Sequence, residues 1–126
     1  MKRLLIAALV AAIIVGSAST QQYDRALVVK TMQSNAALMG QISSASNQKD
    51  YFLAAEKLVE IAQGMIRLVP LAPPKGDKAE WEKTIKAFLV SAYKAIGAAG
   101  NQDAAGLQAA VGEMKKWNQT GHAMFR

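Results

Sequence analysis

The residues best suited to chemistry are one histidine and a few methionines. His122 is the only histidine in the chain, and there is no cysteine. A neutral imidazole nitrogen and a methionine thioether are, respectively, a common and a softer ligand for iron. His122 and Met32 could therefore form an axial pair on a haem iron if the fold brings them together. The alternative is a solvated histidine with methionines that only fill the core.

The absence of cysteine removes several classes of site. Disulfides, thiolate zinc sites, iron–sulfur clusters and a catalytic cysteine are all excluded. A serine hydrolase would need His122 as its base, yet no Gly-x-Ser-x-Gly segment offers a serine to it. We therefore expect no enzymatic activity.

The first residues predict a secretory signal peptide. Met1-Lys2-Arg3 is basic, residues 4–15 are apolar, and residues 16–20 are small and polar. The apolar run is shorter than the ~20 residues that a membrane-spanning helix needs. We place the cut near Ser19, which makes 1–19 a signal peptide and 20–126 a single periplasmic domain without a membrane anchor.

The charge of that domain indicates its partners only broadly. Because Lys2 and Arg3 leave with the signal peptide, the formal net charge falls from +6 to +4. The lysines are spread along the chain and do not alternate with aromatic residues, so the pattern does not indicate nucleic-acid binding. A solvated face, or attraction to an acidic protein partner, is the better interpretation.

The composition predicts an all-α domain. Helix-forming residues dominate, and β-branched residues never alternate with polar ones over the length of a strand. Four segments have a helical period, at about residues 23–44, 50–69, 77–100 and 103–125, and a proline-rich linker at 70–76 separates the second from the third. The economical fold is an antiparallel up-down-up-down four-helix bundle, in which the two chain ends meet.

The same period predicts which side of each helix faces the core. Gly97 and Gly100 are expected to end the third helix. The expected inward residues are Val29, Met32, Ala36 and Met39 on the first helix, Phe52, Ala55, Leu58, Val59, Ala62, Met65, Ile66 and Val69 on the second, Trp81, Ile85, Phe88, Leu89, Ala92 and Ile96 on the third, and Leu107, Ala110, Val111, Met114, Trp117, Gly121 and Met124 on the fourth.

Antiparallel packing places His122 level with the early turns of the first helix. Met32 is the inward methionine nearest that level, whereas Met39 lies seven residues further along, about 10 Å at ~1.5 Å per residue. Met39, like Met65 and Met114, is therefore interpreted as core. Gly112 and Gly121, both within the fourth helix at a cost of ~1 kcal/mol each, fit either the approach of a flat or bulky group or close helix packing.

The end of the chain resembles a known family. Residues 118–126, Asn-Gln-Thr-Gly-His-Ala-Met-Phe-Arg, resemble the ending of the class II c-type cytochromes, the cytochrome c-prime group, where Cys-x-x-Cys-His is followed by two residues, an aromatic and an arginine. Asn118 and Gly121 stand in place of the two cysteines. Residues 29–34 and 38–40 resemble that family's first helix, with Met32 in place of an arginine. A cysteine-free ending with a retained histidine is similar to the cytochrome b562 group, which binds haem noncovalently.

The resemblance implies a periplasmic electron-transfer protein with noncovalent b-type haem and its iron. His122 matches the proximal ligand, and Met32 is the best match to the distal ligand. The other residues that the resemblance and the helix pattern assign to the haem site are Gln33, Ala36, Gly121 and Arg126, the last as a partner of a haem propionate. A periplasmic redox protein is the expected partner, and a homodimer is left open.

Two alternatives to this function remain. One is a haem-free structural or interaction bundle that descends from a class II cytochrome. The other is a five-coordinate haem protein that binds a small gas, which would follow if Met32 points away from the iron and Ala36 lines the pocket in its place.

Overall fold

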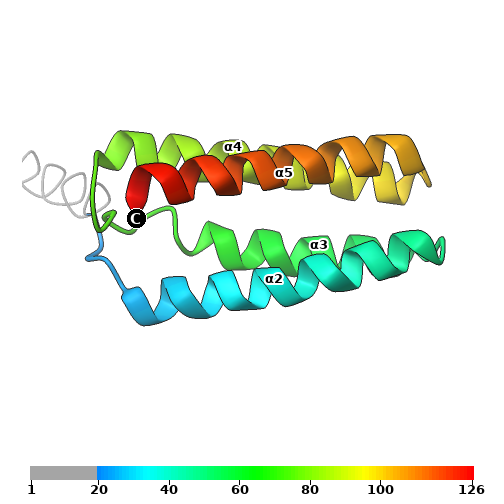
Figure 1. Cartoon of the computed structure of the whole chain (residues 1–126), viewed down its shortest axis with the longest axis horizontal. Coiled ribbons are helices and arrows are strands. Elements are labelled where there is room, and N and C mark those ends of the chain that lie inside the picture. Colours follow the sequence, from blue (N-terminus) through cyan, green and yellow to red (C-terminus); the bar gives the residue numbers. More distant parts are fainter. Residues whose placement is uncertain (1–19) are drawn as a thin grey trace, which may run out of the picture.

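The computed structural model describes residues 20–126, and the predicted signal peptide lies outside the described residues. The described chain forms four helices without a strand: α2 (Arg25–Asn47), α3 (Tyr51–Ile66), α4 (Lys78–Gly100) and α5 (Ala104–Phe125). The prediction of an all-α chain with four helices is confirmed. Each helix packs extensively against the next, and Figure 1 shows each one returning alongside its predecessor, which is consistent with the expected up-down-up-down order. In the described part, no helix is both long and apolar enough to cross a membrane.

Aspartate side chains begin three of the helices. Asp24, Asp50 and Asp103 each accept a hydrogen bond from the amide three residues later, at 3.0, 3.1 and 2.9 Å. Each bond satisfies one of the amides that the first turn of a helix leaves without a partner. The starts of α3 and α5 follow from the caps at Asp50 and Asp103, and they lie within one residue of the starts that the sequence predicted.

The helix ends were predicted less accurately. α3 ends at Ile66, three residues before the expected end, and turns follow it up to the linker. Gly97 lies inside α4 and does not end it, so the expectation for that glycine was wrong. A Cβ at Gly97 would meet no atom within 4 Å, so no close packing contact requires a glycine at this position.

The core lies mainly along α4 and the sides of α3 and α5 that face it. Five of the six inward residues expected on α4 are at most 6% exposed: Trp81, Ile85, Phe88, Leu89 and Ala92. Leu107, Ala110 and Met114 of α5 are buried as predicted. The buried residues of α4 and α5 form one apolar face on each helix. The side of each helix that faces the core could therefore be predicted from sequence periodicity alone.

The predicted inward face of α2 was partly wrong, although Met32 and Met39 pack against the core. Val29 is 42% exposed, Ala36 is exposed, and Met32 and Met39 are only half-buried. The residues of α2 that are buried are Thr31, Leu38, Ile42 and Ala45. Thr31 can be buried because its hydroxyl donates to the Leu27 carbonyl at 2.7 Å, which leaves no unpaired polar group.

The predicted inward face of α3 was also partly wrong. Phe52, Val59 and Ile66 were expected in the core but are 76%, 39% and 48% exposed. The buried face lies to one side of them and consists of Ala54, Leu58, Ile61, Ala62 and Met65. Apolar residues cover well over half of the circumference of α3, so periodicity could not decide which of them would face the other helices.

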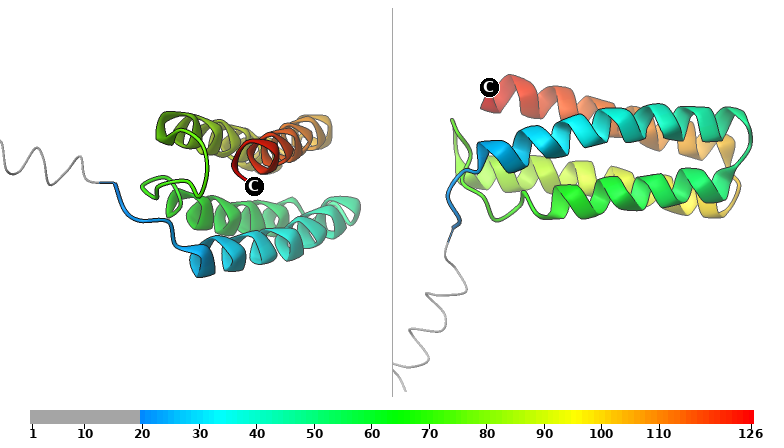
Figure 2. Two further views of the ribbon diagram at one scale, coloured as in Figure 1. Left: turned by 60° about the vertical axis from the view of Figure 1, so that its left-hand side comes forward. Right: turned by 90° about the horizontal axis from the view of Figure 1, so that it is seen from below.

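Backbone hydrogen bonds hold the linker at the end of the bundle where the two ends of the described chain lie (Figure 2). The Gln21 amide donates to the Pro70 carbonyl at 2.9 Å, and the Ala72 amide donates to the Gln21 carbonyl at 2.7 Å. The Trp81 indole donates to the Leu68 carbonyl at 2.9 Å. These bonds fix the segment that closes this end of the molecule.

Candidate functional site

A cavity of about 760 Å³ lies between α2 and α5 at the end of the bundle that carries the linker. Its volume falls in the range of about 300–1,000 Å³ that is usual for sites that bind small organic molecules. Residues three and four positions apart line it from each helix. They are Arg25, Val28, Val29, Met32 and Gln33 on α2, and Trp117, Asn118, Gly121, His122 and Phe125 on α5.

The order of packing explains why space is left here. Each helix packs extensively against the next one in the chain. Because α2 and α5 are the first and the last, they lack such packing against each other. In Figure 2 the α2–α3 pair and the α4–α5 pair form two layers. The cavity lies between these layers, with Trp81, Ile85 and Phe88 of α4 and Met65 of α3 on its inner wall.

The imidazole of His122 borders the cavity with a buried, unpaired nitrogen. Nε2 is buried and has no hydrogen-bond partner. Burial, and secondarily the positive charge of Arg126, lower the pKa of His122 below its ordinary value of 6.5. The ring is therefore neutral at neutral pH, which is the form that coordinates a metal. An unpaired buried polar atom is rare in proteins, because it costs about 1–3 kcal/mol, and a ligand would remove that cost.

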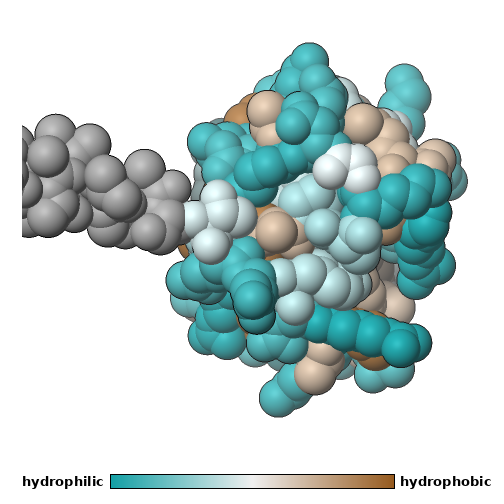
Figure 3. Space-filling model, turned by 90° about the vertical axis from the view of Figure 1, so that its left-hand side faces the viewer, coloured by the Kyte–Doolittle hydropathy of each residue, from teal (hydrophilic) through white to brown (hydrophobic). Residues whose placement is uncertain are grey.

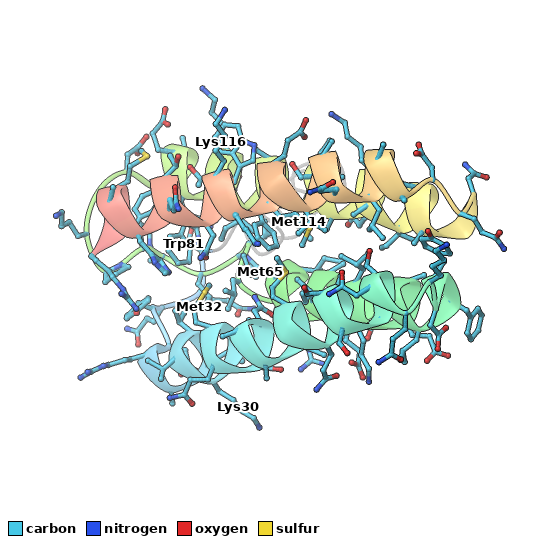
Figure 4. The ribbon with its side chains drawn as sticks, turned by 45° about the vertical axis from the view of Figure 1, so that its right-hand side comes forward. Lys30, Met32, Met65, Trp81, Met114 and Lys116 are labelled. Atoms are coloured by element: carbon cyan, nitrogen blue, oxygen red, sulfur yellow. The ribbon has the colours of Figure 1, made fainter. Side chains whose placement is uncertain are left out.

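Met32 lines the same cavity from the opposite helix. Figure 4 shows its side chain directed from α2 toward the α4–α5 layer, whereas Lys30, two residues earlier, points outward. The structure thus brings Met32 and His122 to one cavity, as the sequence predicted. Met39 does not line it.

Met65 and Met114 are both buried, as predicted, at 4% and 0% exposure. Met65 also borders the cavity, which sequence reasoning did not anticipate. It lies on the inner wall, on α3, whereas Met114 lies deeper in the core. The cavity therefore holds two thioethers, of which only Met32 faces it from the helix opposite His122.

The remaining predicted site residues divide into two groups. Gln33, Gly121 and Arg126 line the cavity. Ala36 is exposed and lies outside the lining, because the side of α2 that carries it turns toward solvent, so it is removed from the site. Asn118, which stands where the resembling family has its first cysteine, also lines the cavity.

Gly121 has no close protein neighbour that would require a glycine. A Cβ built there would meet the Thr84 Cγ2 at 3.6 Å, an ordinary contact, so close helix packing does not explain the residue. Gly112 lies away from the cavity, and a Cβ there would meet nothing within 4 Å. Of the two glycines, only Gly121 is placed where a flat ligand could approach it.

Aromatic residues form much of the wall and were not predicted as site residues. Trp117, Phe125 and Tyr23 line the cavity together with Trp81 and Phe88 of α4. Trp81 is held by its bond to the Leu68 carbonyl and by an edge-to-face contact with Phe125, with ring centroids 5.2 Å apart at 81°. Trp117, Gly121 and Phe125 recur every four residues and so share one face of α5, and this spacing was a signal in the sequence that could have identified both aromatic residues.

A glycine of the linker allows the cavity to close beside Phe125. Gly76 has a φ of +86°, and a Cβ there would lie 3.3 Å from the Phe125 ring. A residue with a side chain would be strained in this backbone region and crowded against the ring. Lys75, the preceding residue, lines the cavity and donates from Nζ to the backbone oxygen of Arg126 at 2.8 Å.

Cationic side chains border the cavity. Arg25, Lys75 and Arg126 line it, and within residues 20–126 none of the three pairs with an Asp or Glu side chain. Figure 3, which views this end of the molecule, shows apolar and weakly polar residues in the middle of the face and hydrophilic residues around them. The site thus combines apolar walls with a cationic margin.

Among the described residues, no group of three or more His, Cys, Asp or Glu side chains is placed to hold a metal ion. A scan against protein-family models, a search of curated proteins and a search of solved structures each found no match to this chain.

Proposed function

We propose that the chain is a periplasmic electron-transfer protein, built as an antiparallel up-down-up-down four-helix bundle, that binds b-type haem noncovalently between α2 and α5. One observation carries the proposal: the buried Nε2 of His122 has no partner and borders a large cavity that Met32 lines from the opposite helix. Coordination to a haem iron would give this nitrogen the partner that it lacks.

The other residues of the cavity suit the same group. The aromatic and aliphatic walls would exclude water from a flat apolar ring, and Gly121 adds no side chain on the wall that carries His122. Arg126, together with Arg25 and Lys75, could pair with two propionates at the margin. Neither Asn118 nor Gly121 has a thiol, so attachment would be noncovalent.

Each ligand residue has a distinct role in this proposal. When bound, haem supplies one-electron redox chemistry. His122 contributes a neutral nitrogen, because burial lowers its pKa. Met32 contributes a soft thioether, which favours the reduced state and raises the potential. The cationic margin would attract an acidic redox partner.

A titration with haemin tests the proposal. We expect a sharpened Soret band that saturates at one haem per chain, and haem that acidified organic solvent extracts completely. His122→Ala should abolish tight binding, whereas Gln119→Ala, an exposed position on the same helix, should bind as wild type. A spectrum equal to that of free haemin at stoichiometric protein would refute haem binding, and haem that resists extraction would refute noncovalent attachment.

The position of Met32 favours the six-coordinate form over the gas-binding alternative. Met32 lines the cavity and Ala36 does not, so the residue expected to replace it is absent from the site. Carbon monoxide should accordingly bind slowly and weakly to the reduced wild-type protein. Rapid, tight binding would support the five-coordinate alternative, and failure to bind haemin at all would support the haem-free bundle.

Export to the periplasm is a separate part of the proposal. It depends on residues 1–19, which lie outside the described part. Expression of the full chain should yield a periplasmic form that begins near Thr20, as judged by mass spectrometry. An uncleaved chain in the membrane fraction would contradict this expectation.

A further inference from the structure

Three uncharged ligand groups line the cavity from three different helices. They are the thioethers of Met32 on α2 and Met65 on α3, and the imidazole of His122 on α5. The His122 Nε2 is buried and has no hydrogen-bond partner in the described chain. A haem bound as proposed above uses Met32 and His122 and gives Met65 no role. Met65 is therefore a third soft ligand that the proposed function does not use.

A close approach of α2 and α3 places the two thioethers near one level of the bundle. A Cβ built on Gly64 would lie 3.4 Å from the Thr31 Cγ2, so the two helices meet at these residues. Met32 follows Thr31, and Met65 follows Gly64. Because the two helices run in opposite directions in Figure 1, the two methionines lie about 3 Å apart along the bundle axis, at ~1.5 Å per residue. Figure 4 shows both side chains directed from the α2–α3 layer toward the α4–α5 layer.

A hydrogen bond sets the level of α4 against α3. The Trp81 indole donates to the Leu68 carbonyl at 2.9 Å, and these two helices also run in opposite directions. Three residues further from the linker, about one helical turn, are Met65 on α3 and Thr84 on α4. Met65 and Thr84 are therefore close to one level.

The contact between α4 and α5 brings His122 to this level. A Cβ built on Gly121 would lie 3.6 Å from the Thr84 Cγ2, and His122 follows Gly121. Met32, Met65 and His122 thus belong to one cross-section of the bundle, on three walls of one cavity. Because methionine has three rotatable side-chain bonds, both thioethers can adjust their positions toward the imidazole.

The chemistry of this group matches monovalent copper. Thioether sulfur is a soft ligand that selects Cu(I), and imidazole also binds copper. Zinc prefers imidazole, thiolate and carboxylate ligands, and residues 20–126 place no cluster of three or more such side chains for a metal. The cationic side chains at the margin, Arg25, Lys75 and Arg126, repel a divalent ion twice as strongly as a monovalent one.

We propose that the haem-free chain binds one Cu(I) ion between the Met32 and Met65 thioethers and the His122 imidazole. No proton has to leave these ligands at neutral pH, since burial lowers the pKa of His122. Haem and Cu(I) exclude each other, because both need the same imidazole nitrogen. The inference does not rest on haem binding, because the soft ligand set and its common level carry it.

Competition for Cu(I) tests the inference in anaerobic, reducing buffer without haemin. Wild type should remove one copper per chain from the Cu(I)–bicinchoninate complex, seen as a loss of the absorbance of that complex. Met65→Leu removes the sulfur at nearly constant side-chain volume, so it should keep the fold and weaken Cu(I) binding about tenfold or more. The matched control is Met114→Leu, the same change at a buried methionine outside the cavity, which should bind copper as wild type does. Circular dichroism should show that both variants remain helical.

X-ray absorption at the copper edge tests the ligands directly. We expect two sulfur neighbours and one nitrogen neighbour in wild type, and one sulfur fewer in Met65→Leu. No uptake of copper by wild type, equal affinity in Met65→Leu and wild type, an equal loss in Met114→Leu, or a copper site without sulfur would each overturn the inference. Because no step uses haemin, a failure of haem binding would refute the proposed function and leave these outcomes decisive for copper.

Discussion

The unpaired nitrogen of His122 predicts that this residue destabilises the haem-free protein. His122→Leu replaces the imidazole with an apolar side chain of similar size and removes the buried Nε2. Removing an unsatisfied buried polar atom should stabilise the chain without ligand by about 1–2 kcal/mol, part of the 1–3 kcal/mol that such an atom costs. The melting temperature should rise by about 4–8 °C for each kcal/mol in a domain of this size.

Haemin should reverse the order of the two proteins. At about 100 times its dissociation constant a ligand adds about 2.7 kcal/mol of stability, and only wild type should receive it. The assay is thermal unfolding by circular dichroism, with and without haemin, for both proteins. Gln119→Leu, exposed on the same helix, reports the effect of leucine on helix propensity alone. A less stable haem-free His122→Leu, or equal stabilisation of both proteins by haemin, would refute the reasoning.

Three further predictions follow from the same site. First, burial lowers the pKa of His122, so the unfolded chain binds the extra proton more readily than the folded chain does. Haem-free stability should therefore decline as pH falls below the ordinary value of 6.5. Urea unfolding should show a smaller decline in His122→Gln. Second, Met32→Ala should keep haem but lower its potential and open it to carbon monoxide, whereas Met39→Ala, outside the cavity, should reduce stability and leave the absorbance spectrum unchanged. Third, Gly121→Ala and Gly112→Ala should each stabilise the haem-free chain by about 1 kcal/mol in urea unfolding, but only Gly121→Ala should weaken haemin binding. Equal haemin affinity in the two alanine variants would show that no ligand approaches Gly121.

The helices and their starts were predictable because their signals are local. Asp50 and Asp103 cap the helices that follow them through bonds that span three residues, and the prolines of the linker exclude a helix wherever they occur. Such interactions need no information about the rest of the fold. The single histidine could be selected in the same way, because its side chain determines the available ligand chemistry, whereas Met32 was chosen among the methionines only through the expected antiparallel register of the first and last helices.

The rotation of α2 and α3 about their own axes was decided by packing. Both helices carry apolar residues on more than one side, so Val29 and Thr31 compete for the core on α2, as Val59 and Leu58 do on α3. Thr31 is buried because a carbonyl one turn earlier satisfies its hydroxyl, and Val29 is left at the cavity. Sequence periodicity cannot resolve such a competition, since the outcome depends on the neighbouring helix.

The sequence by itself determined that this chain would be helical, where three of its helices would begin, and that His122 is its only imidazole. Only the tertiary structure decided that Met32 and His122 share one cavity, that Ala36 lies outside it, and that Nε2 of His122 is left without a partner. The physical reason is range: helix formation and capping depend on residues within one or two turns. A cavity exists only where helices distant in the sequence pack imperfectly, and here those helices are the first and the last.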